Sequence, residues 1–287
     1  MYVGYHVNKH SAGSKKHENT FAFALVAAKE HILESLPSGV RPAAQIFVHG
    51  PKTHEPNVTT EDAEEIKNIP DLSLVIHGAF PDYPWRNNPR AVEGIRGELR
   101  LADAAGASGV IIHLGHEAAS RETLLRVLGK IDRDLDLSSK RTLWLETNVT
   151  TAEKATFATP KGLRELMSAV RSRAYTNIRV GLCLDTAHLH SCGMELQTTT
   201  QVESFLEALP KAKYLLHLND SKMSRGSGRD QHEALGRGEI WEHDQSGLHA
   251  FVKWAKRTRT AIILERHPDD LDHDLKVLSR IIDTKNE

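Results

Sequence analysis

The 287-residue chain has few cysteines, almost no net charge and no long hydrophobic run, and each of these absences excludes a class of protein. Two cysteines, Cys183 and Cys192, are too few for a disulfide framework. Since no basic-then-apolar leader is present either, we expect an intracellular, cytoplasmic protein (nuclear or organellar in a eukaryote) that is not secreted. A net charge of −1 excludes a globally basic nucleic-acid binder but allows a local basic face. The longest apolar stretch, Phe21–Ala28, is far too short to span a bilayer.

Short apolar runs alternate with longer helical patterns along the chain. Most of the runs are continuous Val/Ile/Leu stretches, as in strands that are buried on both faces. The predicted strands are Tyr2–Val7, Gln45–His49, Leu72–His77, Gly109–His113, Thr142–Glu146, Arg179–Asp185, Tyr214–Leu218 and Ala261–Glu265. The predicted helices are Thr20–Ser35, Thr60–Asn68, Pro89–Ala105, Ser120–Leu135, Pro160–Ser172, Thr200–Ala208, Asp244–Lys256 and Leu271–Thr284, with start signals that include Thr59, Pro160 and Thr200 ahead of Glu203.

Eight βα units in a chain of this length predict one α/β domain over residues 1–287, a closed (β/α)₈ barrel. The active site of such a barrel lies at the C-terminal face of the strands. A doubly wound open sheet is the rival architecture, and it would usually carry a GxGxxG turn after its first strand. The corresponding turn here reads HVNKHSAGS, so the sequence favours the barrel.

The 17 histidines are scattered rather than gathered in a run, and many of them fall where a predicted strand ends. A single histidine or acid at such a position is usually a hydrogen-bonded structural residue. In a barrel, however, all the strand ends converge on one face. Two loop motifs add to the set, Asp185-Thr-Ala-His188 after the sixth strand and Asp230-Gln-His232 after the seventh. The candidate ligands are His77, His113, Glu146, Asp185, His188, His217, Asp230, His232 and Glu265.

Four carboxylates on one face would repel one another unless cations balance them. Imidazole and carboxylate without thiolate suit Zn²⁺, with Mn²⁺ or Fe²⁺ as alternatives. Nine ligands are too many for one tetrahedral ion but could serve two or three, if a carboxylate such as Glu146 bridges. Such a cluster favours an anionic substrate, and phosphoester hydrolysis is the reaction class that fits best.

Two segments resemble the endonuclease IV family of zinc-dependent apurinic/apyrimidinic (AP) endonucleases. They are GLCLDTAHLHSCGMEL and HLNDSKMSRGSGRDQHEALGRGEI, and both are quite specific. VIHGAF, IIHLGH, LWLETN and ILERHP match in position and ligand type with divergent neighbours. The resemblance covers the barrel in order, from YVGYHVN to ILERHP.

The resemblance implies a TIM barrel of the xylose isomerase-like superfamily with three zinc ions per chain. His77 and His113 would hold one ion, with Glu146 bridging to a second ion held by Asp185, His217 and Glu265. His188, Asp230 and His232 would hold the third. The family nicks double-stranded DNA 5′ to an abasic sugar and clears blocked 3′ ends, and Glu146 or Glu265 would position the attacking hydroxide. We expect a monomer.

The DNA-reading loops depart from the family pattern in HGPKTHEP, PDYPWRNNP and TNVTTAEKATFATP. Phe80 stands at the family's aromatic wedge, and Tyr83 and Trp85 with Arg86 and Arg90 offer a replacement, unless these aromatics simply cap the barrel. Other predicted substrate contacts, which could equally be ordinary solvated charges, are Lys222, Arg225 and Arg229. For His6, His10 and His49 we expect a supporting role rather than ligation.

Two other functions remain open at this stage. A sugar isomerase or epimerase of the same superfamily would use one or two divalent ions, and the DxH motif after the seventh strand weighs against it. A non-catalytic protein that binds damaged DNA could keep zinc for stability, and the complete ligand set weighs against that alternative.

Overall fold

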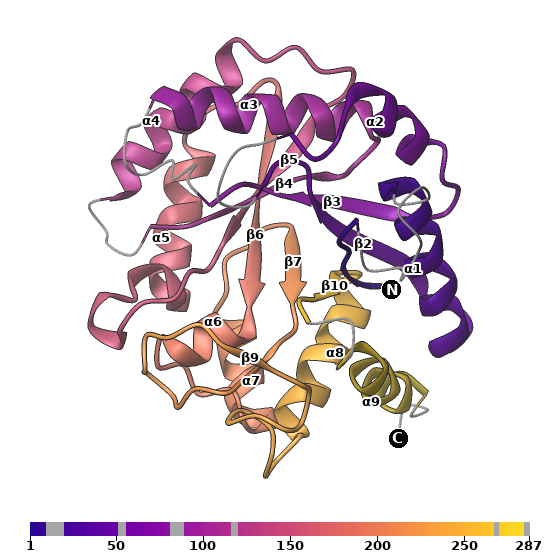
Figure 1. Cartoon of the computed structure of the whole chain (residues 1–287). Coiled ribbons are helices and arrows are strands. Elements are labelled where there is room, and N and C mark those ends of the chain that lie inside the picture. Colours follow the sequence, from indigo (N-terminus) through magenta and orange to yellow (C-terminus); the bar gives the residue numbers. More distant parts are fainter. Residues whose placement is uncertain (10–19, 51–55, 81–88, 116–119, 267–269, 284–287) are drawn as a thin grey trace.

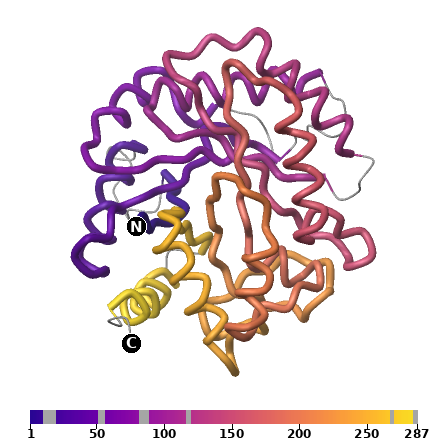
Figure 2. Tube along the Cα trace, turned by 180° about the vertical axis from the view of Figure 1, so that it is seen from behind, coloured from indigo at the N-terminus to yellow at the C-terminus, as the bar shows by residue number. Residues whose placement is uncertain are grey.

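A computed structural model describes residues 1–9, 20–50, 56–80, 89–115, 120–266 and 270–283. Eight parallel strands form a closed barrel in the order β1-β10-β7-β6-β5-β4-β3-β2, with helices between them (Figure 1). This architecture confirms the predicted (β/α)₈ fold. Strand β1 pairs with both β2 and β10, so the two ends of the chain close the cylinder, and Figure 2 shows the indigo N-terminal segment beside the yellow C-terminal one.

The strand and helix bounds agree with the predicted ones to within two residues, except that β2 begins at Arg41, four residues before its predicted start at Gln45, because this whole segment pairs with β1. The barrel strands are β1 (Tyr2–His6), β2 (Arg41–Phe47), β3 (Ser73–His77), β4 (Gly109–His113), β5 (Arg141–Glu146), β6 (Ile178–Asp185), β7 (Tyr214–His217) and β10 (Ala261–Leu264). The α-helices are α1 (Phe21–Ser35), α2 (Thr60–Lys67), α3 (Pro89–Ala104), α4 (Ser120–Arg133), α5 (Pro160–Arg171), α6 (Thr186–Ser191), α7 (Thr199–Glu207), α8 (Ser246–Thr258) and α9 (Leu271–Asp283).

Some short elements lie outside the predicted set. Helix α6 follows β6 directly, and the antiparallel pair β8 (Asp220–Ser221) and β9 (His232–Glu233) organises the loop after β7. Two 3₁₀ turns, η2 (Ala152–Lys154) and η3 (Thr156–Ala158), precede α5. These elements are too short to show a hydrophobic period, which is why the sequence pattern does not reveal them.

Local capping interactions fix several helix starts. Thr59 and Asp62 form a capping box at the start of α2. Thr159 caps α5, whose first residue is Pro160, as its backbone prefers. The predicted start signal of α7 was wrong: the cap is Thr198 with Gln201, because this pair satisfies the free N–H groups two residues earlier than Thr200 would.

The barrel interior holds two layers of inward-facing side chains. The lower one, here called the floor layer, is an apolar cluster of Ala43, Val75, Ile111, Trp144, Cys183, Leu215 and Ile263. Since strand side chains alternate, the next inward positions lie two residues further along. They form the ligand layer, which consists of His6, Gln45, His77, His113, Glu146, Asp185, His217 and Glu265.

Packing around the two layers is continuous. A Cβ atom on Gly181 would lie 2.6 Å from the Trp144 ring, so the glycine leaves room for the indole to fill the floor. Outside the barrel, a second and larger apolar core packs the strands against the surrounding helices. Within the described ranges, no helix combines the length and the apolar character needed to cross a membrane.

Candidate metal centre

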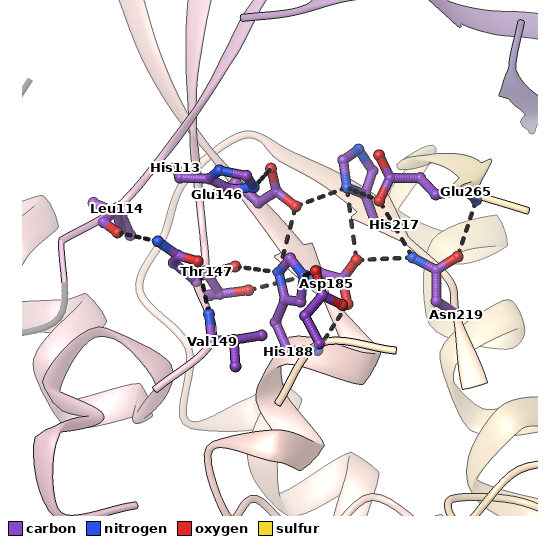
Figure 3. A network of polar contacts seen from close by, with 12 residues as sticks. His113, Leu114, Glu146, Thr147, Val149, Asp185, His188, His217, Asn219 and Glu265 are labelled. Carbon is purple, nitrogen blue, oxygen red and sulfur yellow. Dashed lines mark hydrogen bonds and ion pairs between the residues drawn. The ribbon is translucent and has the colours of Figure 1, made fainter. Parts of the chain in front are cut away.

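The ligand layer lies where the strands end, and Glu146 is its centre (Figure 3). Glu146 is the last residue of β5 and is fully buried. One of its oxygens, Oε2, lies 3.2 Å from His77 Nε2 and 3.1 Å from His113 Nε2. Its other oxygen, Oε1, lies 3.0 Å from His217 Nδ1. A single carboxylate therefore faces imidazoles from three other strands.

His217 joins Glu146 to two further carboxylates. Its Nδ1 atom lies 3.2 Å from Glu265 Oε2 and 3.8 Å from Asp185 Oδ2. His217 and Asp185 are fully buried, and the side chain of Glu265 is 18% exposed. Each of these four residues offers a ligand atom within 4.8 Å of the others, so together they could hold one metal ion.

A third group forms beside Asp185. As the N-cap of α6, Asp185 accepts a hydrogen bond from the backbone N–H of His188, which turns that histidine toward the centre. Strand β9 brings His232 to the same place, within the same 4.8 Å limit. Asp230 lies 3.3 Å from His188 Nε2 and 3.2 Å from His232 Nε2. The structure thus brings all nine predicted ligands together in overlapping groups.

Cys183 lies beside the predicted ligands, and the sequence did not predict this position. It belongs to the apolar floor layer. Its sulfur nevertheless lies within 4.8 Å of Glu146 and His217, directly below the centre. Burial raises the pKa of the thiol to about 12, so Cys183 is a neutral thiol there.

Hydrogen bonds orient four of the histidine rings. The Nδ1 atoms of three rings lie 2.8–3.1 Å from backbone carbonyl oxygens, namely His77 on Gly78, His188 on Thr147 and His232 on Glu265. A carbonyl oxygen only accepts, so each Nδ1 must carry a proton and donate it. The Nε2 atom of each ring is then free to bind a cation, and this is the usual arrangement of metal-binding histidines.

Gln45 orients the fourth ring and is the main residue that sequence reasoning missed. It is fully buried, and its amide nitrogen donates to Glu265 Oε1 over 2.7 Å. Its amide oxygen must then face His217 Nε2, 2.8 Å away, and this leaves the Nδ1 atom of His217 for the centre. The amide nitrogen also lies 3.2 Å from His6 Nδ1, in keeping with a supporting role for His6.

Two further polar residues brace the site from the segment after β7. Asn219 donates to Asp185 Oδ2 over 2.8 Å and accepts the backbone N–H of Glu265. Asp220 accepts the backbone N–H groups of Ser221, Gly236, Gly238 and Ile240, which holds the loop that carries His232. The resemblance of HLND to the endonuclease IV family was the signal that could have identified both residues.

The pKa shifts show how strongly these charges depend on one another. Burial works against ionisation of Glu146, but His113 and His217 outweigh it and hold the pKa of Glu146 well below its usual range. Burial also disfavours a charge on His217, but the carboxylates of Glu265 and Glu146 outweigh it and raise the pKa of His217. Likewise, the carboxylates of Asp230 and Asp185 outweigh burial and raise the pKa of His232 to about 9. In the protein alone, protonated imidazoles balance the buried carboxylates.

Divalent cations would supply the same balance, and the residues fit them. The donors are imidazole nitrogens and carboxylate oxygens, the set that Zn²⁺ accepts. Four rings have their free nitrogen directed into the centre. The Nε2 atom of His232 is buried and makes no hydrogen bond of good geometry.

A cavity of about 270 Å³ opens above the centre, and Phe80 and Arg266 form part of its wall. The Phe80 ring stacks on His113 with centroids 5.4 Å apart. This position suits a wedge residue and an aromatic cap on the barrel equally. The Arg266 side chain is 6% exposed and lies 2.7 Å from Asp270 and 3.5 Å from Glu233. Arg266 is a cation at the site that sequence reasoning missed.

The structure places the other predicted substrate contacts outside the cavity wall. Lys222 lies 3.7 Å from Glu233, Arg225 pairs with Glu195, and Arg229 is an exposed residue one position before Asp230. His49 faces Glu98 at 3.6 Å rather than the centre, because β2 ends at Phe47. Arg90 lies in the first turn of α3. Four other candidates, His10, Tyr83, Trp85 and Arg86, lie outside the described residues.

The fold and the site define a class of protein: a (β/α)₈ barrel with a buried histidine–carboxylate centre at its C-terminal mouth whose side chains could hold metal ions. Residues 42–283 match the family described as xylose isomerase-like TIM barrel. The chain belongs to this family, in the endonuclease IV group.

Relatives and a solved structure support this placement. A probable AP endonuclease of African swine fever virus (isolate Pig/Kenya/KEN-50/1950) is 30% identical over 241 residues, which cover 78% of this chain and 79% of the relative. A probable endonuclease 4 of Haloarcula marismortui is 28% identical over 238 residues, covering 77% and 82%. A solved structure described as AsfvAP:AG has a TM-score of 0.86 at 25% identity and covers 98% of both chains.

Proposed function

We propose that the protein is a DNA-repair AP endonuclease. It hydrolyses the phosphodiester 5′ to an abasic site in double-stranded DNA, and it clears blocked 3′ ends as a phosphodiesterase. The observation that carries the proposal is the sharing of Glu146 and Asp185 between ligand groups. A single tetrahedral ion would use four of the nine side chains as ligands, whereas three ions could use all of them.

The ligand groups suggest how a trinuclear zinc centre would be held. His77 and His113 would bind one ion, and Glu146 would bridge it to a second ion held by Asp185, His217 and Glu265. The third would be held by His188, Asp230 and His232. Bound zinc would lower the pKa of a water molecule and stabilise the oxygens of an in-line displacement.

The protein's own residues prepare this chemistry. Gln45 and three backbone carbonyls fix the histidine rings so that no reorientation is needed when substrate binds. Burial of Glu146 and Asp185 excludes bulk water, which strengthens every interaction in the centre. Glu265, which Gln45 and Asn219 hold from two sides, would position the attacking hydroxide.

The rim of the cavity would hold the DNA. Phe80 would pack against the abasic sugar, where a missing base leaves a gap for an aromatic ring. Arg266 would bind the phosphate at the cavity, and Lys222, Arg225 and Arg229 would contact flanking phosphates. The third ligand group argues against a sugar isomerase, which needs one or two ions.

The decisive experiment is incision of a labelled duplex that carries one abasic-site analogue, with zinc measured per chain. We expect a nick 5′ to the lesion that leaves a 3′ hydroxyl, is abolished by chelator treatment and returns with zinc. His232→Ala should lose one of the three zinc ions and should lose incision, whereas the exposed control Glu64→Gln should keep three ions and normal incision. Zinc at three per chain without any nick would refute the endonuclease, and an undiminished His232→Ala enzyme would refute the site.

A further inference from the structure

The opposite end of the barrel carries a second cavity that the metal centre does not use. It has a volume of about 520 Å³ and lies where β7 and β10 begin. Its wall combines the aromatic residues Trp144, Tyr214 and Trp254 with the cations Lys211, Lys213 and Arg259. A volume of this size suits a small-molecule ligand.

The charge of this region is of one sign. Among the described residues that line the cavity there is no aspartate or glutamate. A neighbouring cavity of about 580 Å³ shares Lys211 and adds Arg164 and Arg171, again with no acid in its described wall. In a chain with a net charge of −1, five cations around two adjoining cavities form a local positive field that attracts an anion.

The aromatic wall contains a buried donor without an acceptor. Trp144 is 8% exposed, and its indole Nε1 makes no hydrogen bond. Such a group costs free energy when it stays unsatisfied, and the same residue lines the cavity. Tyr214 and Trp254 form an edge-to-face pair beside it, with ring centroids 5.4 Å apart. A planar ring system would find an apolar surface there.

Arg259 provides an independent observation. It ends α8 in the left-handed conformation with φ at 58°, where glycine is the usual residue. A side chain in this conformation carries a backbone cost that glycine avoids. The cost is understandable if the guanidinium at that position has a use of its own, such as binding an anion at the cavity.

We propose that this cavity binds a phosphorylated nucleoside, with its phosphate on Lys213 and Arg259 and its base against Trp144 and Trp254. Two kinds of molecule could supply a phosphorylated nucleoside: a free nucleotide, or the phosphorylated end of a DNA single strand. The site lies at the N-terminal ends of the strands, away from the metal centre. Its occupation therefore does not depend on the proposed nuclease reaction.

Tryptophan fluorescence tests the proposal directly, because Trp144 and Trp254 line the cavity. The full-length protein would be titrated with dAMP, with adenosine and with a short 5′-phosphorylated single strand. We expect saturable binding of the phosphorylated probes and none of adenosine. The tighter of the two phosphorylated probes identifies the source.

Arg259→Gly is the sharpest variant, because glycine suits the left-handed cap and should keep or raise the melting temperature. It should weaken binding at least about tenfold through loss of a charge-assisted hydrogen bond, and so should Lys213→Glu. The surface control Lys67→Glu on α2 and the metal-site variant His232→Ala should bind normally. The proposal would be overturned if Arg259→Gly and Lys213→Glu bound dAMP as tightly as the unsubstituted protein does. Loss of binding in His232→Ala would also overturn it, and so would adenosine binding as tight as that of dAMP.

Discussion

The floor layer and the ligand layer belong to the same strands, two residues apart, and yet their chemistry is opposite. Trp144 and Glu146 are successive inward-facing residues of β5, and Leu215 and His217 are successive inward-facing residues of β7. The lower residue of each pair packs in an apolar cluster, whereas the upper one enters a network of buried charges. The floor stabilises the barrel and in doing so provides rigid positions for side chains whose burial costs free energy.

The largest expected effect comes from the ligand layer. Glu146→Gln removes the carboxylate that three of the four ligand groups share. We expect incision to fall on the order of 10³-fold or more, because residues that act as a unit fail together. The melting temperature in the presence of chelator should also fall at neutral pH, because His113 and His217 hold the pKa of Glu146 well below its usual range and the carboxylate therefore stabilises the folded protein. A variant with normal kcat would contradict the role of Glu146, and Glu64→Gln is the matched control.

Substitution in the floor layer should have the reverse effect. Ile111 is fully buried two residues before His113, so Ile111→Ala leaves a cavity and should cost about 2–5 kcal/mol of unfolding free energy. Zinc content and kcat of the folded fraction should stay normal. Ile111→Val, expected to cost about 0.5–1.5 kcal/mol, serves as the graded control. Denaturant titration measures the free energy of unfolding of both variants. Loss of zinc from a stably folded Ile111→Ala protein would contradict the separate roles of the two layers.

Gln45 tests whether the ligand layer depends on neutral residues as well as on ligands. Gln45→Leu removes the hydrogen bonds that orient His217 and Glu265. We expect a 10- to 100-fold loss of metal affinity or activity, the usual effect of removing a residue that supports a ligand. Competition with a chromogenic chelator measures the affinity, and the pH profile of incision should shift as well. Unchanged zinc affinity and pH profile would reduce Gln45 to a packing residue.

The smallest expected effect concerns Asp274, a buried acid outside both layers. Burial raises its pKa to about 6 from 3.8, so the folded protein binds this proton more tightly than the unfolded chain does. The stabilising contribution is therefore complete below about pH 4 and is lost as the pH rises to about 6.

Between these pH values Asp274 should change the free energy of unfolding by an amount on the order of 1 kcal/mol, and Asp274→Asn should remove this change. The amide oxygen of the asparagine can still accept the Leu235 N–H. Denaturant titrations at pH 4, 5 and 6 give the result. An unchanged pH dependence in the variant would assign it to other groups.

Much of the fold and of the ligand layer could be predicted because both follow from where the buried strands run and end and from the two-residue alternation of their side chains. A strand that ends in His113 or Glu146 brings that residue to the barrel mouth whichever loop follows. Gln45 was missed because β2 was predicted to begin there, whereas the strand begins at Arg41 and brings Gln45 to the level of His6. The Arg-Pro-Ala-Ala stretch has little β-branched character, so tertiary pairing rather than propensity decides this strand.

The cation Arg266 and the cavity at the far end could not be predicted for a related reason. Their positions depend on contacts between segments distant in sequence, such as that of Arg266 with Glu233. Helix α6 places His188 through a cap on Asp185, a three-residue geometry that leaves no periodic trace. Pattern reasoning thus identifies the residues that lie on strands better than the loops that join them.

Because β1 and β10 close the barrel, the site can be completed only late in the synthesis of the chain. Gln45 and Glu265 are 220 positions apart, and His31 reaches Asp272 across 241. A chain still being synthesised therefore has most of its ligands before the last strand that aligns them, and these contacts come at the entropic cost of closing a very long loop. A chain that ends before Glu265 therefore lacks one of the nine candidate ligands and the partner of Gln45.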